Sequence, residues 1–185
     1  MLFRSDYLQL QTEYLDNPRD LFPEFKKLYQ CVKAIHSSGV IHRDIKLSNI
    51  MKGDKGESRI IDYNLSATID DIEGLRTLCG TPSYFNRFIA DQSNLYSMPK
   101  DRLIKLWMFN DFWCLMICMS KLLSPKMIHS GKDMEEILES VFERKINYLP
   151  ENSDMAEMIN EVLEKYSKAS RFEDIKITET FDEYI

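Results

Sequence analysis

The sequence predicts a single domain with a mainly α fold, of the α+β class, that carries only short β-hairpins. Apolar residues recur at helical spacing in segments 21–37, 103–123 and 133–168. Segments with strand character are few and at most eight residues long. The chain has 185 residues, of which 44% are hydrophobic and 29% charged, so it is long enough to bury a core.

Residues 7–14 alternate in character and are expected to form a strand. A helix is expected over 21–37 and is stopped by Gly39. Its predicted buried face consists of Leu21, Phe25, Leu28, Val32 and Ile35.

Val40-Ile41 leads into residues 42–49. Short strands are expected at Ile50-Met51 and 59–61, with Gly53 and Gly56 in the turn that separates them.

The most apolar stretch, 103–123, is predicted to be a buried central helix that Pro125 ends. The remaining pattern predicts an amphipathic helix over 134–148, a turn at 148–153 and a second amphipathic helix up to residue 168.

Residues 42–49 read His-Arg-Asp-Ile-Lys-Leu-Ser-Asn, a spacing typical of phosphoryl transfer to a hydroxyl group. Asp44 is expected to orient the hydroxyl and accept its proton. Lys46 is expected to neutralise charge on the transferring group, and Asn49 to hold a magnesium ion. The alternative is an ordinary polar loop between a helix and a strand.

Three further segments carry a family resemblance. Asp62-Tyr63-Asn64 stands where protein kinases have Asp-Phe-Gly, and residues 77–84 resemble the end of an activation segment. Asp111-Phe112-Trp113 resembles the start of the large central helix. Together with residues 42–49, these segments resemble eukaryotic-type serine/threonine protein kinases.

The resemblance extends to the end of the chain, at Ser170-Arg171-Phe172. Lys46 and Gly80-Thr81-Pro82 favour the serine/threonine branch over the tyrosine branch. Residues 47–49 and 77–82 also resemble polo-like kinases, although several other groups share the second segment.

The implied fold is a protein-kinase-like C-terminal lobe with short hairpins and a hinge strand. We predict one truncated kinase-like domain over 1–185, in which 1–17 form the last small-lobe strand and hinge and 18–185 form the large lobe. The rest of the small lobe, with its glycine-rich loop, strand lysine and helix glutamate, is expected to be largely absent from this chain.

The resemblance implies catalytic roles for Asp44, Lys46, Asn49 and Thr81, in which the Thr81 hydroxyl hydrogen-bonds to Asp44 and Lys46. It also implies ATP and Mg²⁺ as cofactors. Asn49 and Asp62 are the expected magnesium ligands.

Further ATP contacts are expected at Glu13 and Leu15 in the hinge, at Asp62, and at Met51 beneath the adenine ring. Met51 has the alternative of a plain core residue.

Arg43 and Thr77 are expected to be regulatory, because phosphate on Thr77 would pair with Arg43. Asp111 is expected to anchor the backbone around His42 and Arg43, with a simple helix N-cap as the alternative.

Two departures from the family pattern bear on activity. Asn64 replaces a glycine, a tolerable change because asparagine adopts left-handed backbone more easily than most residues. Asn86-Arg87-Phe88 replaces Ala-Pro-Glu, which removes the glutamate expected to pair with Arg171; Asp91 or Asp101 is the candidate substitute partner.

Two functions remain open at this point. The first is the catalytic lobe of a serine/threonine kinase that needs a small lobe for robust turnover and acts on a protein substrate. The second is a catalytically impaired, pseudokinase-type module that docks on a kinase or its substrate. Apolar residues on the small-lobe side are expected to be exposed and to attract a partner protein: Leu8, Leu10, Met51 and Tyr63.

Composition narrows the classes of protein to which this chain could belong. A net charge of −6 gives no sign of nucleic-acid binding. The apolar stretch Phe112–Met119 is too short to span a membrane, so no membrane segment is expected. The four cysteines lack metal-ligand spacing and read as thiols of a reducing compartment, which predicts a cytosolic or nuclear location.

Overall fold

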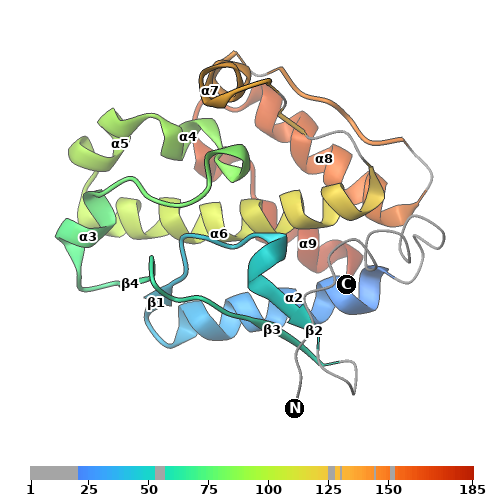
Figure 1. Cartoon of the computed structure of the whole chain (residues 1–185), viewed down its shortest axis with the longest axis horizontal. Coiled ribbons are helices and arrows are strands. Elements are labelled where there is room, and N and C mark those ends of the chain that lie inside the picture. Colours follow the sequence, from blue (N-terminus) through green and yellow to red (C-terminus); the bar gives the residue numbers. More distant parts are fainter. Residues whose placement is uncertain (1–20, 53–56, 125–127, 130, 144, 151–152) are drawn as a thin grey trace.

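The structure, a computed structural model, describes residues 21–52, 57–124, 128–129, 131–143, 145–150 and 153–185 (Figure 1). Its described α-helices are α2 (Leu21–Ser37), α3 (Ile72–Arg76), α4 (Arg87–Ala90), α5 (Gln92–Ser97), α6 (Lys100–Leu123), α7 (Met134–Phe142), α8 (Asp154–Lys168) and α9 (Ile177–Tyr184). Short 3₁₀ helices lie at η2 (Leu47–Asn49), η3 (Pro82–Tyr84) and η4 (Phe172–Asp174). The mainly α fold class is confirmed. The strand expected at 7–14 lies outside the described residues.

Four short strands form two antiparallel pairs: β1 (Val40–Ile41) with β4 (Ala67–Thr68), and β2 (Ile50–Lys52) with β3 (Ser58–Ile60). In the second pair Ile50 lies opposite Ile60 and Lys52 opposite Ser58. The strands expected around Ile50 and Ile60 are confirmed, while β1 and β4 were not predicted. The turn between β2 and β3 lies outside the described residues.

Helix α6 is the central element of the core. Figure 1 shows it crossing the middle of the molecule, with α2 and α9 on one side and α4, α5 and α8 on the other. Trp107, Trp113 and Leu115, which lie on different sides of α6, are all fully buried. Packing on every side removes the usual distinction between a polar and an apolar face, so the second half of the helix is apolar except at Ser120 and Lys121.

Helix α6 is longer than the apolar stretch Phe112–Met119, from which no membrane segment was expected. With 24 residues, α6 is long and apolar enough to cross a bilayer. However, 83% of its most apolar window is buried inside the protein, as in the core helix of a globular domain.

Helix α2 ends as the sequence predicts. Gly39 has a left-handed backbone (φ +78°), and its N–H donates to the carbonyl of His36 at 3.0 Å. The chain therefore reverses at once into β1, and this reversal brings residues 42–49 back over α2 and α6.

Helix α7 is shorter than predicted: it ends at Phe142 rather than near Tyr148. The residues that follow α7 instead form hydrogen bonds with Ser140 and with Ile128, which lies after α6. The Lys145 carbonyl accepts a hydrogen bond from the Ser140 hydroxyl, and the Asn147 N–H donates to the Ile128 carbonyl. These contacts replace helical hydrogen bonds.

His129 is a fully buried histidine beneath α7. Its Nδ1 lies 3.1 Å from the Lys145 carbonyl, so Nδ1 carries the proton of the neutral ring. The ring packs against those of Trp113 and Tyr166. Burial lowers the pKa of His129 from 6.5 to about 4, and the nearby charge of Arg87 acts in the same direction.

The buried neutral state of His129 predicts a pH-dependent stability. Between pH 6.5 and 4 the unfolded chain binds a proton on His129 and the folded chain does not, so the free energy of unfolding should fall by about 3 kcal/mol as pH falls through this range. Urea unfolding at several pH values measures the effect. In His129→Gln the slope over this range should flatten, and an unchanged slope would show that His129 is protonated in the folded protein.

Candidate active site

A compact polar cluster surrounds the Asp44 carboxylate, which is 6% exposed. Lys46 Nζ lies 2.7 Å from Asp44 Oδ2, and the Thr81 hydroxyl donates to Asp44 Oδ1 at 2.7 Å. Lys46 Nζ also donates to the Thr81 hydroxyl oxygen at 3.2 Å. The three residues therefore form a closed triangle of hydrogen bonds that fixes the carboxylate.

Asn49 binds this triangle through its side chain and the segment after β3 through its main chain. Its Nδ2 donates to the Asp44 carbonyl at 3.0 Å and to Asp44 Oδ2 at 3.3 Å, an orientation that leaves its amide oxygen available. The Ile61 N–H donates to the Asn49 carbonyl at 2.9 Å, which places the exposed residue Asp62 beside residues 42–49, the predicted catalytic loop. An amide oxygen and a carboxylate are the oxygen ligands that Mg²⁺ prefers, so these residues fit a magnesium ion.

Asp111 holds the backbone of the catalytic loop. Its Oδ2 accepts from the His42 N–H and its Oδ1 from the Arg43 N–H, both at 2.9 Å. Oδ2 also accepts from His36 Nε2 of α2 at 2.9 Å. The expected anchor contacts are present, and the N-cap alternative is wrong because Asp111 lies in the middle of α6.

His42 joins the catalytic loop to the segment after β3. Its Nε2 donates to the Ile61 carbonyl at 3.0 Å, while Nδ1 accepts from the Asp44 N–H at 3.3 Å. This pair of contacts requires the neutral tautomer that carries its proton on Nε2. The ring also contacts Tyr63, with a centroid distance of 4.9 Å.

Arg43 binds the activation segment through backbone carbonyls. Its Nε donates to the Leu65 carbonyl and its Nη1 to the Gly74 carbonyl, each at 2.6 Å, with a longer contact of 3.5 Å to the Thr77 carbonyl. The exposed Thr77 side chain instead donates to the Glu73 carbonyl. The structure thus brings the two predicted regulatory residues together, but through the main chain of Thr77; phosphorylation there remains a prediction.

Two residues near the site, Gly80 and Asp62, have positive φ values. Gly80 has φ +110°, and a Cβ atom there would lie 2.6 Å from the Arg43 carbonyl oxygen, so only glycine fits before Thr81. Asp62 has φ +65°, and the non-glycine residues with positive φ in the described part of the chain are Arg43, Asp62 and Lys176. Asn64 is not among these residues, so the replacement of glycine by asparagine requires no left-handed backbone there.

The expected substitute partner for Arg171 is also wrong. Arg171 pairs with Asp174 three residues later, at 2.8 Å on the surface. Asp91 instead caps α5 by accepting from Ser93, and Asp101 lies exposed in the first turn of α6. Arg171 needs no distant partner because its side chain points to solvent.

The predicted ATP contacts are only partly within the described residues. Met51 is partly exposed on β2, as an adenine contact requires, whereas Glu13 and Leu15 lie outside the described residues. Burial raises the pKa of the Tyr63 hydroxyl and of the Cys79 thiol near the site, with the charge of Arg43 opposing the shift at Cys79. Both groups therefore stay neutral near pH 7.

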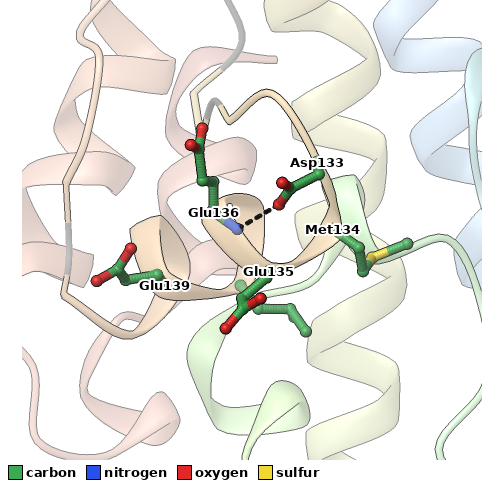
Figure 2. Close-up of a pocket in the computed structure, with 6 residues that line it drawn as sticks. Asp133, Met134, Glu135, Glu136 and Glu139 are labelled. Atoms are coloured by element: carbon green, nitrogen blue, oxygen red, sulfur yellow. Dashed lines mark hydrogen bonds between the residues drawn. The ribbon is translucent and has the colours of Figure 1, made fainter.

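An acidic hollow of about 750 Å³ lies at the start of α7, away from the catalytic cluster (Figure 2). Asp133 accepts from the Glu136 N–H at 3.0 Å, and the Glu136 carboxylate accepts from the Lys132 N–H at 2.8 Å. This arrangement resembles a capping box, in which acidic groups satisfy the free N–H groups of a helix start. The cluster is accounted for as a helix start, and no catalytic role is assigned to it.

Sequence reasoning missed His36 and Trp107 as supports of the site. Trp107 Nε1 donates to the Leu75 carbonyl at 2.6 Å, and the Arg43 guanidinium lies 5.2 Å from the centre of a Trp107 ring. His36 extends the buried face of α2, since it lies four residues after Val32, and this spacing was a usable signal. Trp107 offered no signal beyond its size.

Comparisons with known proteins agree with this geometry. The family model described as "Protein kinase domain" matches residues 18–177. The chain belongs to the protein kinase family.

Three relatives are named as protein kinases, and two of them as serine/threonine-protein kinases. CBL-interacting serine/threonine-protein kinase 13 of Arabidopsis thaliana is 43% identical over 63 residues, 32% of this chain and 12% of its own length. CBL-interacting protein kinase 30 of rice (Oryza sativa subsp. japonica) is 38% identical over 85 residues, 41% of this chain and 17% of its own length. RAC-beta serine/threonine-protein kinase of Rattus norvegicus is 26% identical over 123 residues, 66% of this chain and 23% of its own length.

This chain thus spans less than a quarter of the length of each of these relatives. The polo-like resemblance finds no support in these relatives and remains a prediction.

Replacing Asp111 tests the anchor. In Asp111→Asn one acceptor oxygen becomes a donor that faces other donors, so the free energy of unfolding should fall by roughly 3 kcal/mol. Urea unfolding measures it. Asp101→Asn, an exposed change on the same helix, is the matched control and should stay within about 0.5 kcal/mol. Equal values for the two variants would mean that Asp111 does not support the loop.

Proposed function

We propose that this chain is the catalytic lobe of a serine/threonine protein kinase, which transfers the γ-phosphate of ATP to hydroxyl groups of a protein substrate when a small lobe is supplied. The observation that carries the proposal is the hydrogen-bonded triangle of Asp44, Lys46 and Thr81, with Asn49 bonded to Asp44. A purely structural loop needs no such set of residues.

Asp44 is suited to orient the attacking hydroxyl. A carboxylate offers about four acceptor positions, and Asp44 uses one on Oδ1 for Thr81 and two on Oδ2 for Lys46 and Asn49. One position on Oδ1 remains for a substrate hydroxyl, whose proton Asp44 then accepts. Thr81 and Lys46 hold the carboxylate in place, which removes the entropic cost of orienting it during the reaction.

Lys46 supplies positive charge where the phosphoryl group passes. Its ammonium is partly exposed, with a side-chain exposure of 27%, while Asp44 and Thr81 hold it from the protein side. Asn49 and Asp62 would hold Mg²⁺, which neutralises charge on the phosphate oxygens of ATP when both are bound. Each of these residues lies on the catalytic loop or directly after β3, so the short hairpin fixes their relative position.

A second candidate function is docking without catalysis. Ile61 (37% exposed), Tyr63 (45%) and Leu65 (37%) follow β3 and leave a run of large apolar side chains open to solvent. A partner protein that covers this face would explain their exposure. Leu8 and Leu10, which were expected to belong to the same surface, lie outside the described residues.

The location in cytosol or nucleus is likewise a proposal, supported by the free thiols of Cys114 and Cys118.

The first test concerns nucleotide and metal. ATP with Mg²⁺ at ten times its dissociation constant should stabilise the folded chain by about 1.4 kcal/mol, which raises the melting temperature by roughly 3 to 6 °C. Asp62→Asn removes the carboxylate ligand and should abolish this shift. Glu183→Gln, an exposed change on α9, is the matched control and should keep it. Equal shifts in the native and Asp62→Asn chains would refute the magnesium site.

The second test concerns transfer itself. Fusion of a compatible kinase small lobe before Leu8 should give phosphorylation of serine or threonine in a protein substrate. Asp44→Asn should lower the rate by about 10² to 10⁴-fold, because it removes the proton acceptor. Incorporation of labelled phosphate measures the rate, with Asp70→Asn, a change at an exposed residue of the loop after β4, as the control. Undiminished transfer in Asp44→Asn would rule out the mechanism, and absence of both transfer and nucleotide binding would favour docking.

A further inference from the structure

Arg87, at the start of α4, is a buried cation outside the catalytic cluster. Its side chain is enclosed, and the residue is only 8% exposed. The guanidinium carbon lies 4.2 Å from the centre of the Tyr166 ring and 4.4 Å from that of the Phe88 ring. Its Nη2 donates to the Ala169 carbonyl, and its backbone N–H donates to the Tyr166 hydroxyl at 2.9 Å. Arg87 thus binds both α8 and the turn that follows it.

The ion pair that the family resemblance implies for this region is absent here. Phe88 occupies the glutamate position and packs edge-on against Phe109 and Phe172, at centroid distances of 6.4 and 6.2 Å. Arg171, the expected partner of that glutamate, pairs with Asp174 at the surface. The end of the activation segment is nevertheless attached to the same part of the chain, through Ala169, two residues before Arg171.

We infer that Arg87 is the positioning residue that fastens the end of the activation segment to the connection between α8 and α9, in place of the family's ion pair. The inference rests on the proposed function in one respect: the segment that Arg87 holds carries Thr81. A guanidinium fits this position because it stacks on two aromatic faces and still presents an N–H group to a carbonyl.

The effect of Arg87 reaches Thr81 through a short and rigid stretch of chain. The Asn86 side chain accepts from the Phe88 and Ile89 N–H groups and donates to Asn110 of α6, which fixes the start of α4. Before it, η3 closes with the Tyr84 N–H donating to the Thr81 carbonyl at 2.9 Å. A shift of α4 is therefore passed directly to the residue that contacts Asp44 and Lys46.

Amide hydrogen exchange of the 185-residue chain tests the inference without any need for catalysis. Arg87→Met keeps the bulk of the side chain but removes its charge, and should speed exchange in residues 82–90 at least tenfold, while amides of α2 stay unchanged. Arg87→Lys restores a cation over the rings and should recover most of the protection. A role in packing alone would leave Arg87→Met protected.

Arg171→Gln is the matched control, because this exposed side chain can be changed without loss of folding. It should leave exchange in residues 82–90 within twofold of the native chain. Faster exchange in Arg171→Gln, or native exchange in Arg87→Met, would overturn the inference. If Arg87→Met does not fold, hydrogen exchange in Arg87→Lys is compared with that in Arg171→Gln. The inference fails if exchange in residues 82–90 is faster than native in Arg171→Gln but not in Arg87→Lys. These hydrogen-exchange results do not depend on whether the chain has the proposed kinase activity.

Discussion

The Asp111 carboxylate, fully buried in the middle of α6, is the constraint on which the site depends. A buried carboxylate is tolerated only when donors surround it, and here two backbone N–H groups of the catalytic loop and one ring nitrogen of α2 fulfil that need. The requirement works in both directions. The charge needs those donors, and the donors fix His42 and Arg43 against the core helix, so that Asp44 emerges at one defined place beside Asn49 and Thr81.

The activation segment depends in turn on Arg43. Carbonyl groups of Leu65 and Gly74 occupy its guanidinium, and Trp107 binds the adjacent Leu75 carbonyl from α6. Cationic donors at the end of a short helix satisfy carbonyls that lack partners within the helix. This segment is therefore held against the lobe by its own main chain. A phosphate on Thr77 would have to compete with those carbonyls for Arg43.

The replacement of Ala-Pro-Glu by Asn86-Arg87-Phe88 shows how the same task is met by different chemistry. The family's ion pair joins two long charged side chains, whereas here a guanidinium lies against two aromatic rings and donates to a backbone carbonyl. Phe88 then fills the place of the lost carboxylate with apolar contacts. Arg171 is released to the surface, where a nearby acidic residue, Asp174, pairs with it.

The sequence by itself determined the helix periodicity, the stop at Gly39 and the grouping of Asp44, Lys46 and Asn49, because all of these depend on neighbours within a few residues. Tertiary structure alone decided which residues meet across long separations. Asp111 reads as a possible cap until α6 is seen to begin at Lys100, and nothing in the local sequence indicates that Tyr166 and Ala169 enclose Arg87. Such contacts depend on how helices pack, and packing is fixed by the whole core rather than by local pattern.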